Sequence, residues 1–460
     1  MGHLSKNTGD NCVKRFSSAL TLALVFTAPQ VFAWSNHSFA TYRALEQMPE
    51  LANAAPVTVE PLEAFLKAEE KTIEALLASQ EAWAAANLEK FPARPAALAF
   101  VANADRSDDA RRLAFLMALR VAPNSKFALF IQPDPQLPDI TGTRIAYAAV
   151  NTLPEPQNSG YKFIGLKPGD QIAPLAVIAS ASDEPDYGLD INLWEDSPSD
   201  WGKVYGFGPL PFGNPALNYS TQAPFHMGFY HEDSILYMAA PFIKRTFPLL
   251  RSYQYGSLAA LAFRTGHAYW GWRFAGLSLH YLQDLTQPYH ASLAPGNSTL
   301  QLLGANILAM AGMSGKKDDM VVLLSNRHLA VEKYQKELLQ NAASSKQDTA
   351  IEKALHNTEK DRSYPDWSDR YVRDVVSAQS AAYAPRLAQT LVATVPELFV
   401  SDPSFDFGVK EAGISMVSEL SRRDAAGRAQ LDSAVAQLLG NLGAHSRNAV
   451  RSILKASNQQ

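Results

Sequence analysis

Apolar residues recur at helical spacing along most of the chain. Between about 62 and 88 they return every three or four positions, which is the pattern of an amphipathic helix. Similar spacing predicts helices over residues 37–47, 108–121, 253–285, 321–340, 368–393 and 425–455. Residues 122–225 instead hold many Pro, Gly, Asn and aromatic residues, with short β-like runs at 127–131 and 176–178. We therefore expect a mainly helical, multi-helix bundle over which residues 122–225 form loops and short strands.

The expected helices form one domain. The chain has 460 residues, of which 47% are hydrophobic and 19% charged, enough for one large core. No internal repeat, low-complexity tract or linker divides it. We expect a single domain over residues 34–460, in which residues 400–460 form a C-terminal helical extension.

The first 33 residues have the pattern of a secretory signal peptide. Lys14 and Arg15 precede an apolar run over residues 16–28, and Val31-Phe32-Ala33 offers a small-residue cleavage site. Cleavage after Ala33 would make Trp34 the first residue, and the protein would be exported, periplasmic or secreted. The alternative is an N-terminal helix of the mature fold. The run is too short to span a bilayer, and no later stretch has about 18 apolar residues, so we expect no transmembrane anchor.

Cysteine content and charge narrow the possibilities. The single cysteine, Cys12, lies in the predicted signal peptide, so the mature chain would contain no disulfide. The whole chain has a formal charge of -4, and the first 33 residues hold three basic residues and one acidic residue. The mature chain is therefore more acidic still. This balance argues against a large basic surface, and we expect no stable nucleic acid partner.

One segment carries the candidate chemistry. In Gly276–His290, His280 and Asp284 are four residues apart on a predicted helix and so share one face. Pro288 ends the helical pattern, so His290 leaves the helical register. An imidazole and a carboxylate at this spacing can hold one metal ion or two adjacent ones.

A second pair with the same spacing follows downstream. His328 and Glu332 are again four apart in a predicted helix. The two segments together offer three imidazoles and two carboxylates, enough for more than one zinc ion. Each pair alone could be a surface or core pair, but the chain after Ala33 has only nine histidines and three fall in this pattern. His267, 13 residues before His280 and on roughly the opposite side of the predicted helix, is expected to be structural.

The segment Gly276–His290 resembles the signature of the bacterial zinc-dependent phospholipases C, whose superfamily includes the fungal zinc single-strand nucleases. The resemblance is strongest over residues 265–292 and at the mature N-terminus. It implies a helical fold, a site for about three zinc ions and no Ser or Cys nucleophile. Phospholipid at a membrane or micelle surface would be the substrate.

The resemblance also implies a role for each ligand. The first zinc would be bound by the free amine and carbonyl oxygen of Trp34, together with His37 and Asp284. Asp284 would bridge to a second zinc held by His280, Asp186 and His226, and Asp186 could also orient or deprotonate the attacking water. Asp183, Asp190 and His231 are alternatives for the last two ligands. The third zinc would be bound by His290, His328 and Glu332.

The chain departs from the family pattern in several places. Gln283 and Thr286 replace the commoner residues inside the motif, and no Asn follows His290 at the usual distance. His37 follows Trp34 more closely than in relatives, and the mature chain is much longer than the basic fold. None of these changes removes a proposed ligand. They bear on the substrate and on the shape of the pocket.

Three functions fit these residues. A zinc-dependent phospholipase C that releases diacylglycerol and a phosphorylated head group is favoured by the motif and by the acidic charge. An exported zinc-dependent nuclease or nucleotidase would use the same ligands. A non-catalytic metal-binding protein fits least well, because structural zinc sites are closed by four ligands. Aromatic residues near the motif either contact a choline head group or a base, or pack in the helical core: Trp270, Trp272, Tyr281 and Tyr289.

Overall fold

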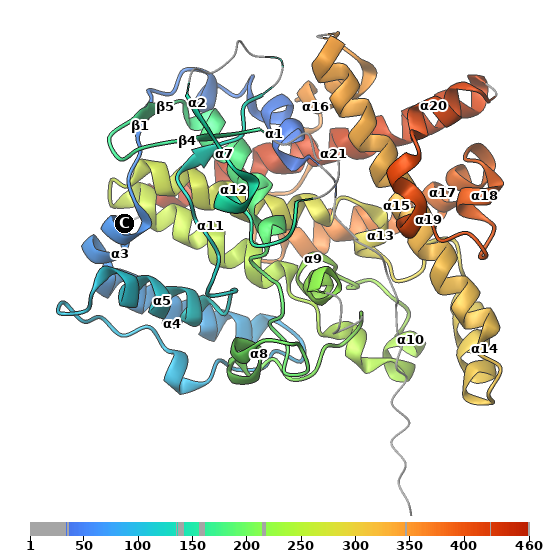
Figure 1. Cartoon of the computed structure of the whole chain (residues 1–460), viewed down its shortest axis with the longest axis horizontal. Helices are drawn as coiled ribbons and strands as arrows, with labels where there is room; N and C mark the ends of the chain where they lie inside the picture. The colour runs from blue at the N-terminus through green and yellow to red at the C-terminus, as the bar shows by residue number, and fades with distance from the viewer. Residues whose placement is uncertain are drawn as a thin grey trace, which may run out of the picture.

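The computed structural model describes residues 34, 36–134, 136, 142–155, 162–213, 218–345, 347–423 and 425–458. Over these residues the chain is mainly helical, as expected, with short strands on one side (Figure 1). The predicted signal peptide lies outside the described residues. No helix in the described part of the chain is both long and apolar enough to cross a membrane.

The centre of the molecule is a helical hairpin. Helices α11 (Pro248–Arg264) and α12 (Ala268–Asp284) lie side by side, joined by a turn in which Gly266 has φ 87°. The expected continuous helix over 253–285 was therefore wrong. The turn residues Arg264, Thr265 and Gly266 are polar or small, and Arg264 and Gly266 are exposed, so the sequence carried a turn signal that the helical spacing on either side obscured. Gly266 can adopt the left-handed conformation that ends α11 without steric cost.

Helix α7 (Pro174–Ser182) packs directly on α12. Residues 176–178, expected to be β-like, are helical, so that expectation was wrong. Pro174 starts the helix, and every residue from Ala176 to Ser182 is buried. A short apolar run buried on all sides has no periodicity that separates a helix from a strand. Gly276 permits the close approach, since a Cβ there would lie 2.4 Å from the carbonyl oxygen of Ile178.

Two helices from the ends of the chain complete this layer. Helix α1 (His37–Leu45) packs on α7. Helix α21 (Ala425–Ser457) packs on α1, α11 and α12 as well as on α16 (Ala350–His356) and α17 (Ala378–Thr394). The segment expected as a C-terminal extension therefore includes a helix that closes the core.

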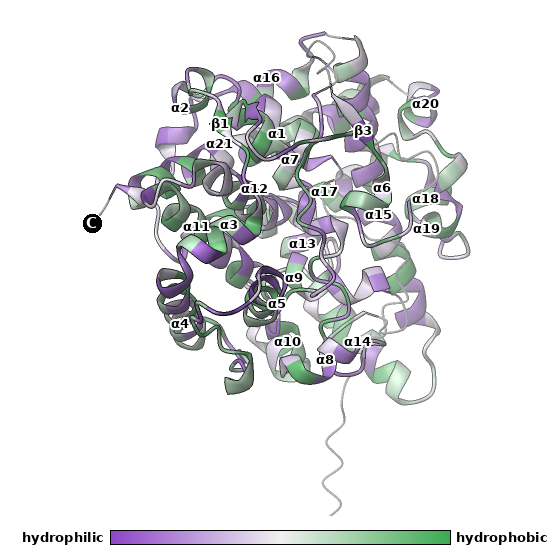
Figure 2. Cartoon of the chain, turned by 60° about the vertical axis from the view of Figure 1, so that its left-hand side comes forward, coloured by the Kyte–Doolittle hydropathy of each residue, from purple (hydrophilic) through white to green (hydrophobic). Residues whose placement is uncertain are grey.

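The helices on the lower left of Figure 1 cover α11. The pattern over 62–88 forms two helices, α3 (Leu62–Ala68) and α4 (Glu70–Asn87), with a break at Glu69. Both bury apolar residues in the same core, so the expected single helix was wrong at that residue. Helix α5 (Asp108–Leu119) starts at Ser107, whose hydroxyl accepts from the Ala110 amide. Helices at the margin, such as α4 and α16, carry both hydrophilic and hydrophobic residues (Figure 2).

The strands lie within two small antiparallel sheets. One pairs β1 (Val57–Thr58) with β5 (Gln171–Ile172), and the other has the order β2-β4-β3. Its strands are β2 (Phe130–Ile131), β3 (Thr143–Ile145) and β4 (Phe163–Gly165). Only the end of the β-like run at 127–131 is therefore a strand. Residues 122–225 also contain helices α6 (Tyr147–Val150), α7, α8 (Asp200–Tyr205) and α9 (Ala223–His226).

Most of the remaining helices lie on the right side of Figure 1. Helix α15 (Gly315–Ser345) contains the expected helix over 321–340. The expected helix over 368–393 is a π-helical turn, Val372–Ser377, that continues into α17. Shorter helices complete the chain: α2 (Pro49–Ala52), α10 (Ser234–Ala239), α13 (Pro288–Ala291), α14 (Thr299–Met310), α18 (Glu397–Val400), α19 (Phe407–Lys410) and α20 (Met416–Ser421).

Candidate metal centre

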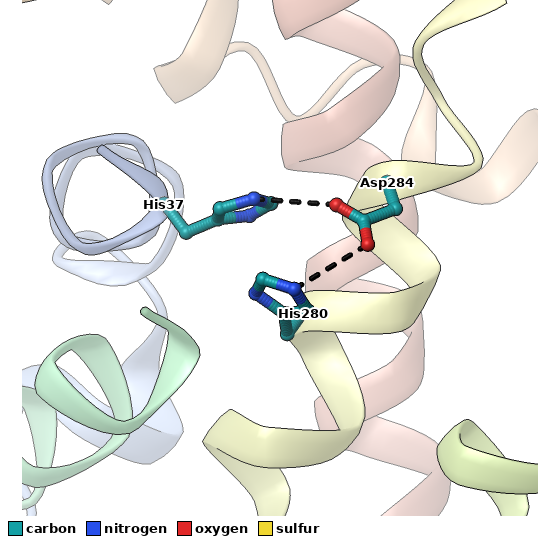
Figure 3. A group of neighbouring side chains, drawn as sticks. All are labelled: His37, His280 and Asp284. Atoms are coloured by element: carbon teal, nitrogen blue, oxygen red, sulfur yellow. Dashed lines mark ion pairs between the residues drawn. The ribbon is translucent and has the colours of Figure 1, made fainter. Parts of the chain in front are cut away.

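The first group of candidate ligands joins α1 to α12. His37 is the first residue of α1, and His280 and Asp284 lie on the last turn of α12 (Figure 3). His37 Nε2 lies 3.3 Å from Asp284 Oδ1, and His280 Nε2 lies 3.4 Å from Asp284 Oδ2. All three side chains are fully buried. This group could hold a metal ion.

Trp34 lies next to the same end of α12. Its side chain is buried, and its indole N–H donates to Thr286 Oγ1 at 2.9 Å. Thr286, a departure from the family motif, therefore anchors the start of the described chain two residues beyond Asp284. The preceding residues are not described, so the structure leaves the proposed role of the Trp34 amine untested.

The second group contains Asp186, His226 and His280. His226 Nδ1 lies 3.0 Å from His280 Nε2 and 2.9 Å from Asp284 Oδ2. Asp186 Oδ1 lies 3.7 Å from His280 Nε2 and 3.9 Å from His226 Nδ1. Asp186 belongs to the short turn Glu184–Tyr187 that follows α7, and His226 ends α9. Asp284 thus faces the first and the second group at once.

The three alternative residues lie elsewhere. Asp183 accepts the Ser38 amide and is not in a ligand group. Asp190 is paired with Arg251, whose Nη2 lies 2.7 Å from its Oδ1. His231 is exposed, and its Nε2 donates to the carbonyl oxygen of Arg373. The geometry therefore favours Asp186 and His226 over these alternatives.

The third group contains His290, His328 and Glu332. His328 Nε2 lies 2.7 Å from Glu332 Oε1 and 3.0 Å from His290 Nε2. Pro288 starts α13 as its first residue, and Gln287 caps it by accepting the Tyr289 amide. This new helix turns His290 away from the axis of α12 and toward α15.

The donors around these groups fit metal ions. Buried polar atoms normally have a hydrogen-bond partner. Among the described residues, His37 Nε2, Asp284 Oδ1 and Asp186 Oδ1 have none and point into the first and second groups. Two pairs of imidazole nitrogens also approach to 3.0 Å. Imidazole and carboxylate donors that converge in a dry site are the ligand set of zinc and similar transition metals.

Further residues orient the ligands, and the sequence did not identify them as such. His280 Nδ1 donates to the Ser182 carbonyl at 2.7 Å, and His290 Nδ1 donates to the His226 carbonyl at 3.0 Å. His37 Nδ1 donates to Gln283 Oε1 at 2.8 Å. These bonds fix each Nδ1 as the protonated nitrogen and leave Nε2 toward the metal group. Gln283 precedes Asp284 and could have been suspected from that position, whereas the two carbonyls leave no trace in the sequence.

His226 has the opposite orientation. Its Nδ1 faces the second group, and its Nε2 lies 3.6 Å from Asp190 Oδ2. Tyr281 donates to the same carboxylate oxygen at 2.6 Å. Asp190, expected as an alternative ligand, thus lies behind His226 as a carboxylate that can orient it.

Burial and neighbouring charges shift the pKa values of three residues in the first two ligand groups. Burial alone would lower the pKa of His37, but the adjacent carboxylate of Asp284 outweighs it and raises the pKa to about 9. Burial also opposes protonation of His226, while Asp190 and Asp284 raise its pKa to about 10. The pKa of Asp186 rises to about 7, chiefly through burial. Without a metal, protons on His37 and His226 supply the positive charge that these carboxylates require.

The aromatic residues near the motif pack mainly in the core. Trp270, Trp272 and Tyr281 are 0%, 6% and 0% exposed. Tyr289 is also buried, and its ring is stacked on His328 at 5.6 Å between centroids. His267 caps α12 and lies 3.0 Å from a Glu60 carboxylate oxygen, outside the three groups.

Comparison of the chain with protein-family models, with curated proteins and with solved structures gave no match. The function of this protein is therefore inferred from the geometry of this site and from the motif Gly276–His290.

Proposed function

We propose that this protein is an exported zinc-dependent phosphodiesterase of the phospholipase C type. It would hydrolyse the bond between phosphorus and the glycerol oxygen and release diacylglycerol and a phosphorylated head group. The observation that carries the proposal is the position of Asp284 between two ligand groups. Its Oδ1 lies 3.3 Å from His37 and its Oδ2 lies 2.9 Å from His226. One carboxylate shared by two such groups is suited to hold adjacent metal ions.

The donor set fits zinc, and the site would take about three ions. Zinc held there would supply positive charge for the phosphate oxygens and make an attacking water more acidic. A phosphodiester resists attack mainly because its negative charge repels nucleophiles, so this chemistry meets the main difficulty of the reaction. The chain contributes a dry, rigid cluster in which imidazole rings are fixed by hydrogen bonds from their far side.

Asp186 is suited to move the proton. Its Oδ1 has no hydrogen-bond partner among the described residues, and burial raises its pKa to about 7. Beside the metal ions, this carboxylate could orient the attacking water, accept its proton and return that proton to the leaving oxygen. In the overall reaction, the water oxygen forms a new bond to phosphorus and the bond from phosphorus to the glycerol oxygen breaks. The proton ends on the hydroxyl of diacylglycerol.

The lipid substrate is supported by two observations. Gly276–His290 resembles the phospholipase C signature, and the chain is acidic overall, with a formal charge of -4. Enzymes that bind single-stranded nucleic acid gain much of their affinity from basic grooves. Export is supported by the signal-peptide pattern of residues 1–33, and cleavage there would free the amine of Trp34.

Metal analysis combined with an activity assay tests the proposal. Purified protein starting at Trp34 should contain about three zinc ions and release diacylglycerol from phosphatidylcholine. His290→Ala and Glu332→Ala should lose zinc and at least about a hundredfold in activity, because both belong to the third group. His267→Gln is the control, since His267 lies at the start of α12 and outside the three groups. Full activity in a metal-free preparation would overturn the proposal.

A further inference from the structure

Exposed apolar side chains gather on one side of the molecule. Within the part of the chain that the structure describes, six of the twelve exposed large apolar side chains lie between residues 235 and 313. The two most exposed of all twelve are Leu300 at 79% and Met238 at 75%. Single exposed apolar residues are common in proteins, but a contiguous group indicates an interaction surface.

Helix α14 carries most of this group. Leu300, Leu303, Ile307 and Met310 are spaced three, four and three residues apart, so they form one stripe along the helix. Leu300, Ile307 and Met310 are 79%, 64% and 56% exposed, and Leu303 is half-buried. The opposite face of α14 buries Leu302 and Ala305.

The composition of α14 is unusual for a helix at the edge of a molecule. Its twelve residues, TLQLLGANILAM, include no charged side chain. A helix that is apolar on both faces is normally covered on both faces. Yet α14 lies at the outer edge of the molecule, with α10 beside it (Figure 1). Helix α10 adds the exposed side chains of Ile235 and Met238.

Positive charge lies next to the stripe. A cavity of about 440 Å³ between α14 and α15 is lined by Leu308, Met320 and Leu323 and also by Lys316 and Arg327. Neither cation is paired with a carboxylate among the described residues, and Arg327 uses only Nε, in a hydrogen bond to the Val400 carbonyl. Asp319 is the one acidic residue in the lining, so the cavity keeps a net positive charge.

The position of α14 connects this surface to the metal centre. His290 ends the segment just before α14, and His328 follows in α15. Ligands of the third group thus flank α14 in the sequence, since His290 precedes it and His328 lies in the middle of α15, directly after Arg327. A substrate-bearing surface that contacts α14 would therefore meet the helix pair whose second member, α15, carries His328 and Glu332.

We infer that the exposed apolar stripe of α14, together with α10 and the cationic cavity, docks the protein on a phospholipid surface that contains anionic lipids. This deepens the proposed function and rests on it for the identity of the substrate. Apolar side chains would enter the boundary between head groups and acyl chains, while Lys316 and Arg327 would face lipid phosphates. A second copy of the chain would also cover the stripe, but the net positive charge of the cavity beside it is complementary to the phosphates of an anionic lipid surface.

Vesicle binding tests the inference separately from catalysis. The zinc-loaded protein is sedimented with sucrose-loaded vesicles of phosphatidylcholine, with or without about one-third phosphatidylglycerol, before detectable hydrolysis. The variant with Leu300→Ser, Ile307→Ser and Met310→Ser should bind at least about tenfold more weakly, because these side chains no longer transfer into the lipid. The matched control changes three exposed residues on the α5 and α8 side, Val101→Ser, Leu113→Ser and Val204→Ser, and should bind as wild type.

The substitution Lys316→Ala tests whether the positive charge of the cavity contributes to vesicle binding. Binding to vesicles with phosphatidylglycerol should fall about fivefold, and binding to pure phosphatidylcholine should not change. Hydrolysis of a soluble, short-chain phosphatidylcholine should be the same in the α14 variant as in wild type, which also verifies that the variant is folded and keeps its zinc.

Each outcome decides a different point. If wild type binds vesicles through α14 but cleaves neither lipid, the inference stands and the proposed function fails. If wild type cleaves both lipids and the α14 variant binds vesicles unchanged, the inference is overturned. It is also overturned if wild type ignores vesicles and forms a dimer that the α14 substitutions dissociate, since the stripe would then be an interface between two copies.

Discussion

At the scale of single residues, the amide of Gln283 links three parts of the molecule. It accepts from His37 and donates to Thr41 Oγ1 at 2.9 Å and to Ser446 Oγ at 3.1 Å. It thereby connects α1, α12 and α21 behind the first ligand group. The sequence identifies Gln283 only as a departure from the family motif. Its role depends on contacts with residues more than 160 positions away, which no local pattern encodes.

The first prediction is that Gln283→Met weakens zinc binding in the first group by about 10–100-fold, because the ring of His37 loses its fixed orientation. Gln335→Met is the matched control. Gln335 is also fully buried, but neither of its amide atoms has a partner among the described residues. Competition with a chromophoric chelator measures both variants. Equal zinc affinity of Gln283→Met and wild type would contradict the role given to Gln283.

The second prediction concerns pH in the metal-free protein. The folded-state pKa values of His37 and His226, about 9 and about 10, exceed the ordinary histidine value of 6.5. A raised pKa means that the folded protein binds more protons, so the stability contributed by these two imidazoles is full below about 6.5 and falls as pH rises toward 10. We expect the free energy of unfolding to drop by a few kcal/mol over this range, at about 1.4 kcal/mol per pKa unit.

Urea unfolding of chelator-treated protein at several pH values measures this drop. With zinc bound, the imidazoles are held as neutral ligands, so the dependence should largely disappear. A metal-free protein equally stable at both ends of the range would show that the two imidazoles are not protonated in the folded state.

At the scale of helices and strands, the sequence predicted the long amphipathic helices better than the buried ones. Helices α5, α15 and α21 lie close to their expected bounds, because each has one exposed face that gives the apolar pattern a period. Helix α7 was missed because nearly all of its residues are buried, and the turn at Gly266 was missed because helical apolar spacing resumes on both sides of it. His280 and Asp284 are only one helical turn apart, so their spacing still predicted that both side chains lie on one face of the helix.

The third prediction tests the contact between α7 and α12. A Cβ on Gly276 would lie 2.4 Å from the Ile178 carbonyl oxygen and 2.6 Å from Ala181 Cβ, so the backbones must separate. Gly276→Ala should lower the free energy of unfolding by about 1–3 kcal/mol. It should also weaken zinc binding, since Ser182, which holds His280, is on the displaced helix.

Gly304→Ala in α14 is the matched control for that substitution. No atom lies within 4 Å of a Cβ built on Gly304. Alanine is the better helix former, so this change should be neutral or stabilise the protein by up to about 1 kcal/mol. Chemical denaturation of both variants gives the comparison, and equal effects would mean that α7 and α12 are not closely packed at Gly276.

At the scale of the whole molecule, the site is assembled from segments that are far apart in the chain. The ligands extend from His37 to Glu332, and α21 closes the core behind them. The sequence predicted the ligands within Gly276–Glu332 from spacing and the distant ones, such as Asp186 and His226, from family resemblance alone. Distances between segments follow from packing, which explains why Asp190 and His231 could not be distinguished from the chosen residues beforehand.

The fourth prediction concerns the mature N-terminus. Trp34 is buried and its indole N–H donates to Thr286, so the predicted mature N-terminus lies at the end of α12 that carries Asp284. Protein with one extra Gly before Trp34 should fold but lose about one zinc ion and most activity, because the amine is displaced from the first group. Protein starting at Trp34 is the control. Full zinc content and activity in the extended protein would contradict the role of the amine.

Product analysis tests the central claim most directly. Zinc-loaded protein starting at Trp34 is given phosphatidylcholine vesicles and single-stranded oligonucleotides side by side, at equal zinc and salt. We expect the protein to release diacylglycerol and phosphocholine and little nucleotide. Asp284→Asn should release neither lipid product. Rapid release of mononucleotides without diacylglycerol would contradict the phospholipase activity and assign the same metal centre to a nuclease.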